Sequence, residues 1–188
     1  MDRTTRQAMI YATATAIPLA AIAALLLYGY GSPTSDTAEA TESARPQATG
    51  PVSMIAPNIP SAAADVCKRL VSALPVALRD RQRRPVTAGP EQNAAYGDPP
   101  ITLTCGVSPA AFPSTDQLWR LDAVCWHHRD DGDATVWTTV DRQVPVQVRL
   151  PRKYEPATQW TIGFSSSVST SVPTLPAVPS GCRPNVTS

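Results

Sequence analysis

Hydrophobic and polar positions alternate with a period of two in four segments of the chain. These segments are residues 101–107, 118–126, 135–142 and 143–150. Such alternation, interrupted by turn residues, is typical of strands with one buried face. It predicts a small antiparallel sheet of about four strands. Pro145 has no amide hydrogen to donate, so the fourth strand either lies at an edge of the sheet or begins there.

The segment 61–74 has the period of an amphipathic helix instead. Its apolar residues recur at intervals of three and four, and this stripe places Cys67 on the buried face. Ser61 or Asp65 can cap the start of the helix, and Pro75 ends it.

A second amphipathic segment follows Pro156. Its apolar residues lie three, seven and eleven positions after the first, namely Ala157, Trp160, Phe164 and Val168. Many serines and threonines lower the helix propensity of this segment. Together the patterns predict an α+β domain over residues 61–184, with one or two helices packed on the sheet.

The longest apolar run, residues 8–30, precedes this domain. As a helix it is about 34 Å long, enough for a bilayer core of about 30 Å. Arg3 and Arg6 come before the run and acidic residues follow it, which places residues 1–7 in the cytoplasm and the domain outside. We therefore predict a single-pass signal anchor in the cytoplasmic membrane. A cleaved signal peptide is the alternative, although its apolar core is usually shorter.

Residues 31–60 are rich in proline, serine, threonine, alanine and glycine, and carry three acidic residues against one arginine. This composition offers little apolar surface to offset the entropy of ordering, and it predicts a disordered linker. A short apolar patch at 52–59 leaves open whether part of the linker docks on the domain. We also expect a disordered tail at 185–188.

Charge and cysteine content narrow the class of protein. The 16 basic and 15 acidic residues nearly cancel, so no nucleic-acid partner is indicated. An even number of cysteines in an exported domain predicts two disulfides, and the lack of a CxxC pair argues against zinc or thioredoxin chemistry. The sequence alone permits three connectivities among Cys67, Cys105, Cys125 and Cys182.

One cluster has residue types that bind metals: His127, His128, Asp130, Asp131 and Asp133. The Asp-Gly pair within it favours a hairpin tip, and adjacent histidines on a strand point to opposite faces. We interpret the segment as a solvated hairpin tip and keep a metal-assisted hydrolase as an alternative function. The nucleophile elbow, the phosphate-binding loop, the dinucleotide fingerprint and the zinc-protease motif are all absent from the sequence. We predict no enzyme activity, no catalytic residue, no cofactor and no metal.

Two further features carry alternatives. The four arginines in residues 79–84 (Arg79, Arg81, Arg83 and Arg84) could bind anionic lipid or an anionic polymer, although a solvated connector is the simpler interpretation. The four tryptophans could form a binding patch, with Trp126 and Trp137 paired across the hairpin, although burial in the core is more usual.

The stretches "VCKRLVSALP", "RRPV" and "YGDPPITLTCGV" resemble the domain of unknown function 3515 family, an uncharacterised group of exported actinobacterial proteins. The resemblance covers roughly residues 61–170. It implies a membrane segment, a short linker and one small domain, with Cys67 paired to Cys105. Cys125 and Cys182 would then form a second bond, which resembles an addition in a mycobacterial subgroup. Tyr96 stands where the family commonly has tryptophan.

The resemblance implies no activity, cofactor or substrate. We therefore predict a non-enzymatic binding or interaction module of the cell envelope. Its partners would be the cytoplasmic membrane, through one helix, and an envelope protein or cell-wall component.

Overall fold

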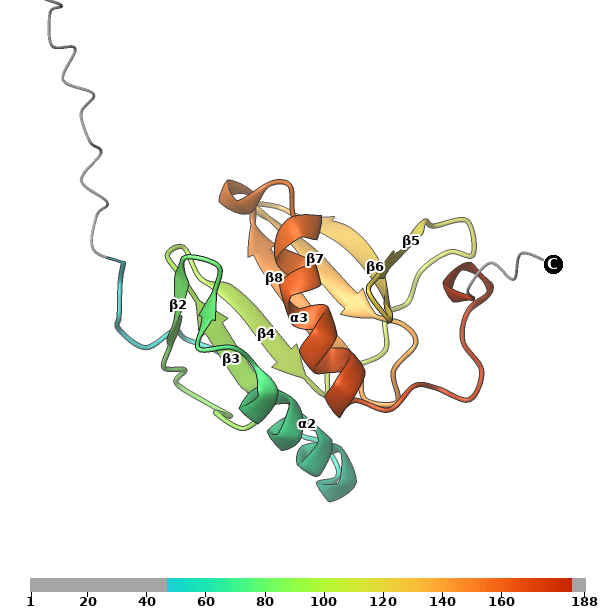
Figure 1. The fold of residues 1–188 in the computed structure, drawn as a ribbon, viewed down its shortest axis with the longest axis horizontal. Coiled ribbons are helices and arrows are strands. Elements are labelled where there is room, and N and C mark those ends of the chain that lie inside the picture. Colours follow the sequence, from blue (N-terminus) through green and yellow to red (C-terminus); the bar gives the residue numbers. More distant parts are fainter. Residues whose placement is uncertain (1–46, 184–188) are drawn as a thin grey trace, which may run out of the picture. The chain divides into compact units, whose positions relative to one another are not determined.

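The computed structural model describes residues 47–183 (Figure 1). The predicted membrane anchor at 8–30, the first part of the predicted linker and the predicted tail at 185–188 lie outside these residues. Across the described range, no helix combines the length and the apolar character needed to cross a bilayer.

The domain is built on an eight-stranded sheet with the strand order β1-β2-β3-β4-β8-β7-β6-β5. All neighbouring strands are antiparallel. The strands are β1 (Ala77–Leu78), β2 (Arg81–Arg84), β3 (Asn93–Tyr96), β4 (Ile101–Cys105), β5 (Leu118–Leu121), β6 (Val124–Asp131), β7 (Ala134–Thr139) and β8 (Val146–Pro151). The predicted α+β class and the antiparallel pairing are confirmed, whereas the sheet has twice the predicted number of strands.

The additional strands lack the alternation on which the prediction rested. β2 consists of polar residues, and all four residues of β3 are buried. The predicted strand at 118–126 is in fact two strands, because Asp122 adopts a φ of +52° and reverses the chain. Leu121 therefore pairs with Val124 across the turn.

The position of β8 decides between the two alternatives for Pro145. The strand begins at Val146, directly after the proline, and lies between β4 and β7 near the centre of the sheet. The prediction that the strand begins at the proline is confirmed, and the predicted edge position is wrong. Because Pro145 precedes the ladder, its missing amide hydrogen removes no bond between strands.

The predicted hairpin connects β6 to β7, but its turn lies one residue later than the sequence suggested. Asp131 pairs with Ala134, so the two turn residues are Gly132 and Asp133, and of these Gly132 has a positive φ of +63°. A glycine at the first central position is typical of a two-residue hairpin turn. This register places Trp137 opposite His128, so the predicted pairing of Trp137 with Trp126 is wrong.

The stretch that carries the family resemblance forms the hairpin between β3 and β4. Gly97 turns the chain with a φ of +73°, and a Cβ there would lie 2.9 Å from the Tyr154 hydroxyl oxygen. The Tyr154 hydroxyl donates a hydrogen bond to the carbonyl oxygen of Pro99 at 2.7 Å. The peptide bond between Asp98 and Pro99 is cis.

Two helices, α2 (Ser61–Ala73) and α3 (Thr158–Ser171), cover one face of the sheet (Figure 1). No side chain caps α2, so the predicted caps Ser61 and Asp65 are wrong; Pro60 precedes the helix instead. Leu74 is extended, as expected of a residue before proline. The core lies between the helices and the sheet, where Leu70, Phe164 and Val168 are fully buried.

Two disulfides join distant parts of the domain. Cys67 of α2 is bonded to Cys105 of β4, with Cα atoms 5.5 Å apart. Cys125 of β6 is bonded to Cys182, which belongs to the short 3-10 helix η2 (Ser180–Cys182), with Cα atoms 5.6 Å apart. This is the pairing that the family resemblance implied.

The segment 47–60, expected to belong to the linker, lies against the domain. Val52 forms a parallel bridge with Val86 and is buried. The Arg84 guanidinium donates to the carbonyl oxygen of Gly50 at 2.8 and 3.0 Å, and Asn93 donates to that of Ile55 at 3.1 Å. The domain contacts therefore begin well before α2.

Candidate functional site

The hairpin residues that the sequence singled out lie on both faces of the sheet. His127 is buried on the face away from α3, where its Nε2 lies 2.8 Å from Asp116 Oδ2 and its ring stacks on Phe112 at 4.6 Å. His128 points to the other face, toward Trp119 and Trp137. The two imidazoles therefore cannot share one ion.

The aspartates of the same hairpin are engaged with arginines. Arg149 pairs with Asp131 and with Asp133, the latter at 2.9 Å, and Arg152 pairs with Asp130 at 3.4 Å. The hydrogen bonds from Arg149 and Arg129 lower the pKa of Asp131. Within residues 47–183, no three His, Cys, Asp or Glu side chains gather as a metal site would require.

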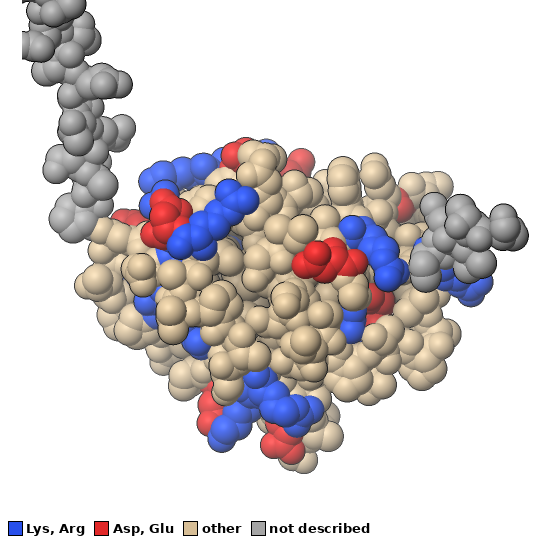
Figure 2. Space-filling view, viewed as in Figure 1, with Lys and Arg blue, Asp and Glu red and all other residues tan. Residues whose placement is uncertain are grey.

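The arginine-rich segment is an edge hairpin rather than a solvated connector. Arg83 donates to the carbonyl oxygen of Val71 at 3.1 Å, and Arg79 lies over the ring of Trp160 at 5.1 Å. Arg81 pairs with Asp80, while Arg84 binds backbone carbonyls. On the face drawn in Figure 2, basic and acidic side chains lie next to one another around a largely uncharged centre.

The tryptophans divide into core residues and a separate cluster. Trp126 is fully buried, and its indole donates to the Ser165 hydroxyl at 3.2 Å. Trp119 and Trp137 instead gather around His128, and we call these three residues the aromatic cluster. The Trp119 ring lies 5.9 Å from that of His128 and 6.1 Å from that of Trp137, both edge to face.

Strand pairing explains why the cluster forms. One row of opposed residues crosses the helix-bearing face of the sheet: Ala94, Leu103, Val148, Trp137 and His128. A neighbouring row ends in Leu150, Thr135 and Asp130. In β8 the two rows have the apolar residues Val148 and Leu150, whereas in β6 they have the polar residues His128 and Asp130. The same face of the sheet therefore changes from apolar core to polar surface.

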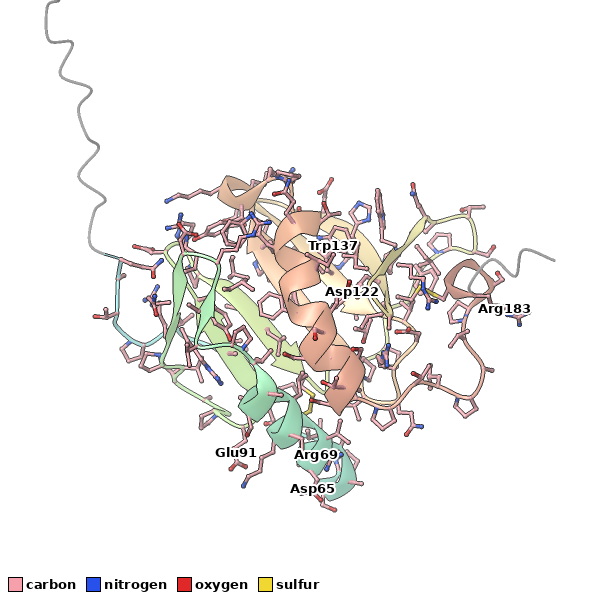
Figure 3. All side chains as sticks on the ribbon, viewed as in Figure 1. Asp65, Arg69, Glu91, Asp122, Trp137 and Arg183 are labelled. Carbon is pink, nitrogen blue, oxygen red and sulfur yellow. A yellow bond between two sulfur atoms is a disulfide. The ribbon has the colours of Figure 1, made fainter. Side chains whose placement is uncertain are left out.

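A cavity of about 300 Å³ lies where this polar part of the face meets the beginning of α3. Trp119, His128 and Trp137 form one wall, and the segment from Glu155 to Thr158 forms the other. Figure 3 shows Trp137 beside α3. We call this space the aromatic pocket.

Three nitrogen atoms of the pocket lining have no hydrogen-bond partner among the described residues. They are the indole Nε1 atoms of Trp119 and Trp137 and the Nδ1 atom of His128, and all three are buried. Trp137 is only 3% exposed. Because all three atoms are closed off from solvent, they lie behind the surface of the cavity and not on it.

Two carboxylates border the pocket. Glu155 accepts a hydrogen bond from the Thr135 hydroxyl at 3.2 Å and another from the backbone N–H of Ala157 at 3.1 Å. Glu155 therefore fixes the start of α3 against β7. Asp130 is exposed and pairs with Arg152. The pocket thus combines aromatic walls with carboxylates at its border.

A larger groove of about 940 Å³ lies on the opposite face of the sheet. Residues 52–57 form one side of it, and Pro99, Pro100 and Thr102 are among its other lining residues. Its arginines are already paired with the hairpin aspartates, as described above. None of the residues that line the groove carries an unpaired buried atom.

The sequence could have predicted the contact between His128 and Trp137, but not the rest of the aromatic pocket. Once the turn is placed at Gly132 and Asp133, counting back along both strands brings His128 opposite Trp137. Trp119 could not be added, because the tight turn at Asp122 has no glycine to mark it. The contribution from the beginning of α3 comes from tertiary packing alone.

The comparisons with known proteins agree with the resemblance noted in the sequence. The family model described as "Protein of unknown function (DUF3515)" matches residues 15–177, which is most of the chain. No curated protein and no solved structure matches. The chain belongs to the domain of unknown function 3515 family.

Proposed function

We propose that this protein is a membrane-anchored, extracytoplasmic binding module of the cell envelope that carries out no chemical reaction. The apolar run at 8–30, with Arg3 and Arg6 just before it and three acidic residues against one arginine in the 30 residues after it, supports a single-pass anchor with the N-terminus inside. The two disulfides support an oxidising location for the domain.

The aromatic pocket is the binding site in this proposal. Its lining is the observation that carries the proposal: Trp119, His128 and Trp137 border a cavity of about 300 Å³ together with Asp130 and Glu155. A cavity lined by aromatic rings with a few polar groups is the usual form of a small-molecule site.

The carboxylates favour binding over catalysis. Glu155 is engaged by Thr135 and by the backbone of α3, so it serves to hold the pocket together. Asp130 is exposed and paired with Arg152.

Site-specific photo-crosslinking in intact cells tests this proposal. A photoreactive residue replaces Thr158 at the pocket, and a matched control carries it at Ser72 on the exposed side of α2. We expect an adduct from position 158 only, and we expect Trp119→Ala to abolish it. Adducts that are identical at both positions, or that persist in Trp119→Ala, would show that the pocket is not the binding site.

A topology measurement tests the anchor separately. A membrane-impermeant thiol reagent should label a cysteine added at Ser72 and should not label one added at Thr5 in intact cells. Labelling of the N-terminal position would contradict the proposed orientation.

A further inference from the structure

We infer that the ligand of the aromatic pocket is an organic cation, namely a quaternary ammonium group whose nitrogen is fully alkylated. This inference rests on the proposed function, since it names the chemical class of the ligand in the same pocket. The charges around the cavity, its aromatic rings and the hydrogen bonds that its carboxylates already accept all favour this class.

The carboxylates give the cavity a negative border. Asp130 and Glu155 line it, and no lysine or arginine of residues 47–183 does. Arg152 pairs with Asp130 at 3.4 Å, but this pair is exposed, so solvent weakens it. The first turn of α3 also lies beside Glu155, and a helix N-terminus carries about half a positive charge. Against two carboxylates these contributions leave the border net negative, which attracts cations and repels anions.

The aromatic rings lie next to these charges. His128 comes two residues before Asp130 on β6, so both side chains are on the same face of the strand. Trp137 is directly opposed to His128 and stacks on it. The ring of Trp119 is inclined by 79° to His128 and by 62° to Trp137, so it forms a second wall at a steep angle to the stacked pair. Aromatic faces are electron-rich and attract cations.

The lining offers few free hydrogen-bonding groups. Glu155 Oε1 accepts from the Thr135 hydroxyl, and Oε2 accepts from the backbone N–H of Ala157. Asp130 is engaged by Arg152. Both indole nitrogens are closed off from the cavity, so the tryptophans present only carbon atoms to a ligand.

This shortage of acceptors distinguishes between kinds of ammonium group. A primary ammonium has three N–H donors that must exchange water for protein acceptors, whereas a quaternary ammonium has none. Charge and aromatic surface suffice to bind the quaternary group. The cavity of about 300 Å³ is at the small end of ligand sites and suits a group that is similarly compact.

Nuclear magnetic resonance of the indole groups tests the inference directly. The full chain, in an uncharged detergent and with ¹⁵N-labelled tryptophan, has four indole N–H signals, one for each tryptophan. The cationic probe is choline, and the neutral control is the alcohol in which a tert-butyl group replaces the trimethylammonium group of choline. We expect choline, at millimolar concentration, to shift the signals of Trp119 and Trp137 but not that of Trp126, whose N–H is bonded to Ser165. The neutral alcohol has the same shape and should bind about tenfold more weakly.

Two substitutions in the same hairpin measure the contribution of charge. Asp130→Asn removes a carboxylate from the border of the cavity and should weaken choline binding about fivefold. Asp133→Asn removes the same charge from the turn, outside the cavity, and should change the affinity by less than about twofold at physiological salt. Both aspartates are exposed, so neither substitution disturbs the core. Equal choline affinities for the two variants would overturn the inference.

Two substitutions at Trp119 measure the contribution of the ring. Trp119→Phe keeps an aromatic wall, whereas Trp119→Leu keeps an apolar wall without one. Choline should bind the leucine variant about fivefold more weakly than the phenylalanine variant, while the neutral alcohol should bind both alike. Choline affinities that do not differ between the two variants would contradict binding by the aromatic surface.

A third probe, ethanolamine, separates this inference from the proposed function, because it has the skeleton of choline with a primary ammonium group. If ethanolamine or the neutral alcohol binds at least as tightly as choline, the pocket binds a ligand but the quaternary ammonium assignment is wrong. If no probe shifts the signals while position 158 gives its specific adduct, the proposed function stands and the inference is wrong. If no probe shifts them and position 158 yields no specific adduct, both are wrong.

Discussion

The imidazole of His128 stacks on the indole of Trp137, with ring centroids 5.0 Å apart and ring planes inclined by 26°. The two residues are directly opposed on β6 and β7, so the hairpin turn at Gly132 fixes their contact. A change in that turn would alter one wall of the aromatic pocket without touching any residue that lines it. The predictions below concern the turns, charges and covalent bonds that hold this geometry.

Three glycine substitutions separate backbone strain from steric contact. Gly132→Ala should lower the free energy of unfolding by about 1–2 kcal/mol, because φ is +63° while no atom lies within 4 Å of the added Cβ. Gly97→Ala should lower it by about 3 kcal/mol, because the Cβ also meets Tyr154 at 2.9 Å. Gly50→Ala, with neither constraint, is the control. Urea unfolding measures all three, and equal losses for Gly97 and Gly132 would contradict the steric role of Tyr154.

Arg142 should be the most important single charge for stability. It is 5% exposed, pairs with Asp141 at 3.3 Å, and donates to the carbonyl of Val172 at 3.1 Å and the hydroxyl of Thr174 at 3.0 Å. We expect Arg142→Leu to lower the free energy of unfolding by about 3–5 kcal/mol, because Asp141 would remain buried without its cation. Arg129→Leu, at an exposed ion pair, should change it by less than about 0.5 kcal/mol. Similar losses in both variants would contradict this assignment.

Tyr96 should make the domain sensitive to alkaline conditions. Burial raises the pKa of its hydroxyl above the ordinary value of about 10, although Arg83 opposes this shift. The folded state therefore disfavours the phenolate. This stabilisation is complete below about pH 10 and is lost as the pH rises toward the folded-state pKa.

Urea unfolding at pH 8 and at pH 11 checks this prediction. Tyr96→Phe should lose about 1 kcal/mol at pH 8, because the hydrogen bond to the carbonyl oxygen of Pro75 disappears. It should then lose less stability than the unmodified chain on going to pH 11. A parallel decline in both proteins would exclude Tyr96 as the titrating group.

The two disulfides should contribute similar amounts to stability. They close loops with sequence separations of 38 and 57 residues, and each should raise the free energy of unfolding by about 4 kcal/mol through the entropy of the unfolded chain. The double variants Cys67→Ser/Cys105→Ser and Cys125→Ser/Cys182→Ser measure the two contributions separately. Non-reducing peptide mapping checks the pairing, and a peptide joining Cys67 to Cys125 would refute it.

The sequence predicts those parts of the fold in which buried and exposed residues recur at a regular interval along the segment. β4 and β8 alternate strictly, and α2 has a clear apolar stripe, so their patterns sufficed. All four residues of β3 are buried, so both faces of this strand are covered. β2 has no fully buried residue, and its arginines Arg83 and Arg84 donate hydrogen bonds to backbone carbonyl oxygens. Neither strand alternates between apolar and polar residues, so hydrophobic periodicity does not predict them.

The aromatic pocket could be predicted only in part for a related reason. Histidine and tryptophan types were visible, but their grouping depends on strand register and on the turn at Asp122, a non-glycine residue with positive φ. The alternative of a metal site in the same hairpin rested only on the presence of histidines and aspartates close together in the sequence. The alternation of faces separates those residues in space.

The contacts of residues 47–60 determine how the domain would respond to mechanical tension from an N-terminal anchor. Tension along the chain would first load the bridge between Val52 and Val86 and the contacts of Gly50. It would next reach α2, which Cys67 ties covalently to β4 beside the central strand β8. Strands β1 to β3 lie between the two bonded cysteines, so once these first contacts are broken the load passes from α2 to β4 without crossing them. Under tension the domain can release its first residues while the sheet and the aromatic pocket keep their shape.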